Sequence, residues 1–134
     1  MDFLQPKVKG RPGSTPGSVD YRLARRRIIR AVEAGDVDAK DYRDAQRELL
    51  RVATSCSVEA DEACPLCDAD ELRLVRFVFG PRLPKGGRCV TTERELQRLA
   101  NRSGEHRCYV VEVCTACRWN HLQSTFLLQA DQSA

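Results

Sequence analysis

The sequence predicts an α+β fold in which an N-terminal antiparallel helical hairpin packs on a C-terminal ribbon of strands. Apolar residues recur at three- and four-residue spacing between residues 19 and 53, which is the period of helices. Runs of β-branched and aromatic residues, bounded by turn residues, follow after residue 71. Two Cys-x-x-Cys pairs flank these runs. With 134 residues, the chain is long enough for one domain.

Composition divides the chain into five segments. Residues 1–17 hold three prolines and three glycines beside basic residues, which predicts a flexible basic arm. The helical hairpin is predicted for 18–54, a connector for 55–63, the ribbon domain for 64–129 and a disordered tail for 130–134.

Local signals place the two helices of the hairpin. Ser18 is a suitable N-cap for a first helix from about Val19 to Ala34, and Gly35 is placed to end it. Asp38 can cap a second helix that carries apolar residues as far as 53. Because the turn between them is short, the two helices are expected to pack antiparallel.

The ribbon domain is predicted to contain three strands and one helix. The run 72–79 ends at Gly80-Pro81 and is typical of a strand. Thr92 and Glu95 form a capping-box pattern for a short helix to about Asn101. Residues 107–113 and 119–128 are predicted as two further strands.

The two Cys-x-x-Cys pairs predict a metal site. Cys64 with Cys67, and Cys114 with Cys117, each allow two thiolates to turn toward one ion, and four thiolates complete a tetrahedral Zn²⁺ shell. Such a shell leaves no open position for water, so the site is expected to be structural. A redox dithiol and an iron–sulfur cluster are the alternatives. His121 is expected to lie beside the ligands rather than to replace one. The fold is thus a helical hairpin on a four-cysteine zinc ribbon with an inserted helix.

Three further cysteines share no knuckle spacing. For Cys108, which precedes an apolar run, we expect the role of a small buried hydrophobic residue. Cys56 and Cys89 have no predicted role, and a second metal site is not expected.

Arginines at helical spacing form the second candidate site. Arg22, Arg26 and Arg30 recur every four residues, and Arg27 lies near the same side. Guanidinium groups in such a stripe bind phosphates or carboxylates; the alternative is a solvated face. Trp119, after the second cysteine pair, is either a cover over the metal site or a further contact residue.

Charge and motifs exclude several classes of protein. The formal net charge is only +3; residues 1–60 carry 12 basic and 9 acidic side chains, and residues 61–134 carry ten of each. No apolar run could span a membrane, and no signal peptide is seen, so a cytoplasmic protein without membrane contact is expected. We find no nucleotide-binding, hydrolase or zinc-protease motif, and we expect no catalytic residues and no enzymatic activity.

The pattern of motifs resembles an uncharacterised actinobacterial family of zinc-ribbon proteins, a domain of unknown function. The likeness covers roughly residues 19–128 and rests on Val19-Asp20-Tyr21, Arg25-Arg26-Arg27, Cys64-Pro65-x-Cys67, Phe77-Val78-Phe79-Gly80 and Val111-Glu112-Val113-Cys114-x-x-Cys117-x-Trp119-Asn120-His121-Leu122. It implies a bacterial cytosolic protein and assigns no activity. The family pattern has Cys-Asp-Ala in the second helix, where this chain has Arg43-Asp44-Ala45.

These observations favour a non-catalytic zinc-binding adaptor. It would dock on a large nucleoprotein machine, RNA polymerase or the ribosome, through the arginine stripe and the zinc knuckle. Direct binding of DNA or RNA is the alternative, and the low net charge argues against it. The sequence leaves the partner and the oligomeric state open.

Overall fold

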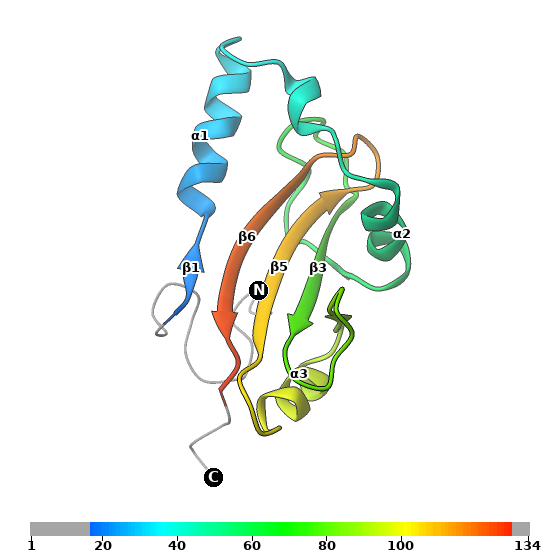
Figure 1. Ribbon diagram of the computed structural model, residues 1–134. Coiled ribbons are helices and arrows are strands. Elements are labelled where there is room, and N and C mark those ends of the chain that lie inside the picture. The colour runs from blue at the N-terminus through cyan, green and yellow to red at the C-terminus, as the bar shows by residue number, and fades with distance from the viewer. Residues whose placement is uncertain (1–16, 130–134) are drawn as a thin grey trace.

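The computed structural model describes residues 17–129, which form an antiparallel sheet of six strands with three α-helices (Figure 1). The predicted tail and all of the predicted arm except Gly17 lie outside these residues. The elements in chain order are β1 (Val19–Asp20), α1 (Arg22–Glu33), the 3-10 turn η1 (Ala39–Tyr42), α2 (Arg47–Ser55), β2 (Val58–Glu59), β3 (Leu72–Phe79), β4 (Arg88–Cys89), α3 (Glu93–Ala100), β5 (Arg107–Cys114) and β6 (Asn120–Leu127).

Three long strands form the centre of the sheet. The strand order is β1-β6-β5-β3-β2. β2 pairs with the start of β3, and β4 pairs with the other end of β3. β3 pairs with β5 over its full length, from Leu72 opposite Cys114 to Phe79 opposite Arg107. A bulge between Val110 and Val111 shifts the register of β5 against β6 and leaves Gln123 as the extra residue.

Helices cover the two faces of the sheet in different places. On one face, Leu74 and Val110 pack with Leu96 and Leu99 of α3 in the larger core. On the other face, Val75 packs with the fully buried Ala53 of α2 and its neighbours. The alternation of side chains along β3 explains both clusters, because residues 74 and 75 must point to opposite faces.

The prediction of an N-terminal helical hairpin is wrong. α1 packs beside β6, whereas α2 packs on β3 and β5, so the two helices stand apart along the sheet (Figure 1). An apolar stripe on a helix specifies that something must cover it and does not specify what. Here the three long strands offer two apolar faces: α2 buries Ala53 on one of them, whereas α1 only partly buries Ile28, against the cluster of Cys64 and Trp119. The fold is therefore rich in sheet rather than a helical unit attached to a ribbon.

Several boundaries also differ. Residues 19–20 form an edge strand, and the helix starts only at Arg22. Asp38 caps the turn η1 by accepting from the N–H of Lys40, and α2 begins at Arg47. The two-residue strands β2 and β4 were not predicted, since they are too short to show a period of two. The strand at 72–79 is confirmed with the same bounds. α3 and β5 differ from prediction by one residue at their C-terminal ends, and β6 is one residue shorter at each end.

Within residues 17–129, none of the helices combines the length and the apolar character that crossing a bilayer requires.

Candidate metal centre

Two loops at one end of the sheet bring the four predicted cysteines together. Cys64 and Cys67 lie in the loop between β2 and β3, while Cys114 ends β5 and Cys117 lies in the turn to β6. Leu72 pairs with Cys114 across the two strands, so the first loop is held above the second. The four Sγ atoms lie within 4.8 Å of one another.

The distances between thiols fit one ion. Zn²⁺ binds thiolate sulfur at about 2.3 Å, and a regular tetrahedron of that radius has edges of about 3.8 Å. The Sγ atoms of Cys64 and Cys117 are 3.6 Å apart, and those of Cys67 and Cys114 are 3.7 Å apart. Both distances run between the two pairs, so the loops face each other at the spacing that a shared ion needs. A disulfide would need about 2.05 Å, and all four cysteines are free.

The two Cys-x-x-Cys turns have the same backbone design. In each, the first cysteine's carbonyl accepts from the N–H four residues on, that of Asp68 or Arg118. A backbone N–H within each turn also donates to the first cysteine's Sγ at 3.4 Å.

Asp68 and Arg118 close these turns in the left-handed region, with φ of 63° and 75°. That conformation costs a non-glycine residue roughly 1 kcal/mol or more, and such strain gathers at ligand clamps. Neither position holds a glycine or an asparagine, the residues that usually signal this conformation, so the two residues could not be found from the sequence.

Burial dominates the protonation of the cluster. Removal from water raises the pKa of the Cys64 and Cys114 thiols above the usual range. Burial acts in the same sense on Cys67, but the Ala69 N–H and the neighbouring thiols stabilise its thiolate, and its pKa is lowered. A cluster that mixes a favoured thiolate with buried thiols is suited to a cation, which offsets the buried negative charge.

Trp119 connects the cysteines to a buried carboxylate. Its ring is fully buried in a cluster with Cys64 and Cys114, where it covers one side of the site and presents no surface to a partner. Its Nε1 donates to Glu112 Oε2 at 2.7 Å. Glu112, also fully buried, accepts at Oε1 from Arg25 of α1 at 2.6 Å and from Gln123 at 2.9 Å. Sequence reasoning missed Glu112 and Arg25, because nothing in the spacing shows that residues 87 positions apart meet.

His121 lies next to this cover and not among the ligands. Its ring stacks on Trp119 with centroids 5.8 Å apart, and its Nε2 lies 3.3 Å from the carbonyl oxygen of Tyr21. It therefore links the cover over the cysteines to the start of α1.

The remaining cysteines lie away from the cluster. Cys108 is fully buried in the larger core, and burial raises its pKa to about 12. The Cys89 thiol on β4 donates to the Cys56 carbonyl at 2.8 Å, and burial together with Cys56 raises its pKa.

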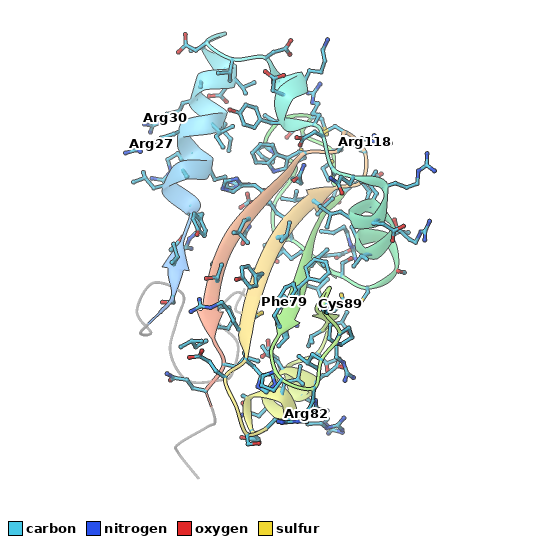
Figure 2. The ribbon with its side chains drawn as sticks, in the orientation of Figure 1. Arg27, Arg30, Phe79, Arg82, Cys89 and Arg118 are labelled. Carbon is cyan, nitrogen blue, oxygen red and sulfur yellow. The ribbon has the colours of Figure 1, made fainter. Side chains whose placement is uncertain are left out.

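The predicted arginine stripe is on the outer side of α1. Arg22, Arg26, Arg27 and Arg30 are all exposed, and Arg27 and Arg30 point away from the sheet in Figure 2. Arg22 pairs with Asp20 at 2.6 Å and holds the pKa of that carboxyl below its usual range. Within residues 17–129, the other three form no ion pair that the geometry shows.

Two shallow hollows lie elsewhere on the sheet. One, of about 410 Å³, is polar, but polar side chains in its wall already have partners within the protein. Thr115 donates to Glu71, and Arg73 donates to Ser57. The other, of about 290 Å³, is apolar.

Comparison with known proteins places the chain among relatives without an assigned activity. The model of the family described as "Family of unknown function (DUF5318)" matches residues 14–134. Uncharacterized protein Rv0049 of Mycobacterium tuberculosis (strain ATCC 25618 / H37Rv) is 37% identical over 116 residues, or 87% of this chain and 85% of the relative. Uncharacterized protein Mb0050 of Mycobacterium bovis matches with the same identity and coverage. No solved structure matches significantly.

Proposed function

Because this chain belongs to the family of unknown function DUF5318, whose relatives above occur in the actinobacterial genus Mycobacterium, we propose a function from its own residues. It is a non-catalytic binding protein in which a structural Zn²⁺ at Cys64, Cys67, Cys114 and Cys117 holds the sheet. The outer arginines of α1 bind a partner. The observation that carries the proposal is the four-thiol cluster with distances that match a tetrahedral zinc shell.

The donor set supports zinc and a structural role. Four soft sulfur ligands in tetrahedral spacing favour Zn²⁺ over hard cations such as Mg²⁺ and Ca²⁺. Two of the four thiols are buried and Trp119 covers one side, so a bound ion would have no open position at which water or substrate could react.

The arginines support the binding role. Arg26, Arg27 and Arg30 stand on a helix that is fixed from its inner side by Arg25, so they form a prepared cationic surface. We propose a cytoplasmic adaptor that docks through this surface on a nucleoprotein machine, RNA polymerase or the ribosome. Direct DNA or RNA binding by the same arginines is the second candidate. It is favoured because, within residues 17–129, these arginines are exposed and pair with no carboxylate.

Metal content tests the zinc proposal. Protein purified with zinc should hold one ion per chain by elemental analysis, and Cys114→Ser should lose it and unfold far more readily. The ion contributes on the order of 10 kcal/mol in comparable sites, about as much as a whole domain's stability. The matched control is Cys108→Ser, a buried cysteine outside the cluster, which should keep its zinc. Full zinc content in Cys114→Ser would overturn the ligand assignment.

A capture experiment tests the binding role. The protein is used to capture partners from an extract of the source organism, in nuclease-treated and untreated halves, with mass spectrometry as the readout. Polymerase or ribosomal subunits that persist after nuclease support the adaptor. Loss of every partner with nuclease supports the second candidate.

A triple variant tests the surface itself. Arg26→Gln/Arg27→Gln/Arg30→Gln should abolish capture, whereas Arg94→Gln/Arg98→Gln/Arg102→Gln changes the charge equally at α3 and its C-terminal end and should not. Equal capture by both triple variants would show that the stripe is a solvated face and does not bind the partner.

A further inference from the structure

From the composition of the outer face of α1, we infer that its partner is an acidic polypeptide segment that also carries a large apolar side chain. This inference rests on the arginine surface of the proposed function and adds the kind of partner. The contact surface consists of Leu23, Arg26, Arg27 and Arg30 on the outer side of α1.

The N-terminal end of this surface is apolar. Leu23 is 58% exposed and Val19 is 43% exposed, and they are the large hydrophobic residues that stand exposed within residues 17–129. They are four positions apart in the chain. Elsewhere in that part of the protein, side chains of this size are at least partly buried. Leu23 therefore adds an exposed apolar side chain to the arginine face of α1.

The arginines follow Leu23 along the same face of the helix. Arg26, Arg27 and Arg30 follow Leu23 by three, four and seven residues, so all four side chains share one face of the helix. Arg25 lies between Leu23 and Arg26 in the chain, but its side chain points inward and is 16% exposed. The helix therefore has an arginine-rich outer side and a different side that faces the sheet.

This face is unfavourable for the isolated chain. Like charges at i,i+3 and i,i+4 destabilise a helix, and the pairs Arg26–Arg30 and Arg27–Arg30 have that spacing. Glu33, three residues after Arg30, is the single acidic residue of α1, and within residues 17–129 no ion pair joins it to these arginines. Carboxylates from a partner would remove the repulsion and pair bidentately with the guanidinium groups.

The helix that carries this surface is fixed by contacts on its inner side and at its start. Arg25 pairs with buried Glu112 and with Glu62, and His121 approaches the carbonyl of Tyr21 at the start of the helix. A rigid surface loses little conformational entropy on binding, so side chains that are already aligned give more affinity.

The exposed leucine distinguishes a polypeptide from a nucleic acid. Phosphate backbones are bound by cationic and hydrogen-bonding groups and give an exposed leucine nothing to contact. Protein interfaces, in contrast, combine arginines with a desolvated apolar centre. The observed surface has both components, and we therefore place the acidic polypeptide first and nucleic acid as the opposing outcome.

Two probes test the inference with the zinc-loaded full chain. A phage-displayed library of random 12-residue peptides is selected on the protein, and a 20-nucleotide single-stranded DNA is titrated in parallel. We expect the selected peptides to combine Asp or Glu with a large apolar residue. Leu23→Ser should weaken the best peptide about tenfold or more, since the burial of one leucine side chain is lost. Leu23→Met should retain binding, and neither change should affect the far-ultraviolet circular dichroism.

The outcomes separate this inference from the proposed function. If Arg26→Gln/Arg27→Gln/Arg30→Gln weakens the selected peptide but Leu23→Ser does not, the apolar contact at Leu23 is refuted and the arginine surface stands. If DNA binds more tightly than every selected peptide, or no acidic peptide is selected, the inference is refuted. If the triple variant changes binding to neither probe, the arginine surface itself is refuted.

Discussion

Replacing the buried Glu112 with glutamine should destabilise the protein strongly. The carboxylate is fully buried and accepts three hydrogen bonds, from Arg25, Gln123 and Trp119. A carboxamide has one oxygen and one NH₂ group in the same space. Whichever way it is placed, its NH₂ group faces at least one donor that then has no acceptor.

The expected loss follows from two contributions. Arg25 is 16% exposed and pairs with two carboxylates; the variant would remove the buried one, Glu112, and leave only the exposed Glu62. Removing one partner of a buried ion pair costs about 3–5 kcal/mol, and a buried donor without a partner costs about 1–3 kcal/mol. Because the two contributions overlap at the same atoms, we expect about 3–5 kcal/mol in total.

Glu62→Gln is the matched control. It removes the other carboxylate on the same arginine, but Glu62 is 58% exposed, and exposed pairs contribute about 0–1 kcal/mol. Urea unfolding of the zinc-loaded variants, followed by the fluorescence of the single tryptophan, gives both values. Equal stability of the two variants would refute the conclusion that Glu112 anchors α1 to the sheet.

Three further changes probe the core and the loops. Because burial raises the pKa of Cys108 to about 12, almost no thiolate is present at pH 8; iodoacetamide should therefore spare it in the native protein and modify it after unfolding, and mass spectrometry that found equal labelling would contradict this. Thr92→Ala should cost about 1 kcal/mol in urea unfolding, since the Thr92 hydroxyl oxygen accepts from the Glu95 N–H at the start of α3; an unchanged midpoint would mean that this cap contributes nothing. Gly87→Ala should cost at least about 1 kcal/mol, because φ is +86° and the new methyl would lie 2.8 Å from the Phe79 ring; a variant as stable as the parent would show that this turn can relax.

The predictable elements are those with a strong local pattern. The run 72–79 is continuously apolar except at two arginines, and the cap of α3 is visible as Thr92 with Glu95 three residues on. The cap is only half of the predicted box, because the Glu95 side chain pairs with Arg88 and does not return to the Thr92 backbone N–H. The two Cys-x-x-Cys pairs could be predicted to lie together because their chemistry leaves few other uses for that spacing.

The elements that could not be predicted depend on distant parts of the chain. The apolar sides of the first two helices gave no sign that they face a sheet and not each other. The carboxylate that pairs with Arg25 comes from the middle of β5, and its neighbours Val111 and Val113 suggested only a buried strand. The covering role of Trp119 could be stated as an alternative, but choosing it required the position of Glu112.

Because Leu72 is paired with Cys114, the geometry of the cysteine cluster depends on how β3 is aligned with β5. If β3 slipped by one residue against β5, its side chains would exchange faces, and if it slipped by two, they would move about 7 Å along the partner. Either error would carry Cys64 and Cys67 out of reach of Cys114 and Cys117, since sulfur must approach an ion to about 2.3 Å. An ion that binds all four thiols therefore stabilises only one alignment of the central strands. Chains that collapse in another alignment are not stabilised by the ion, so their strands can separate and pair again.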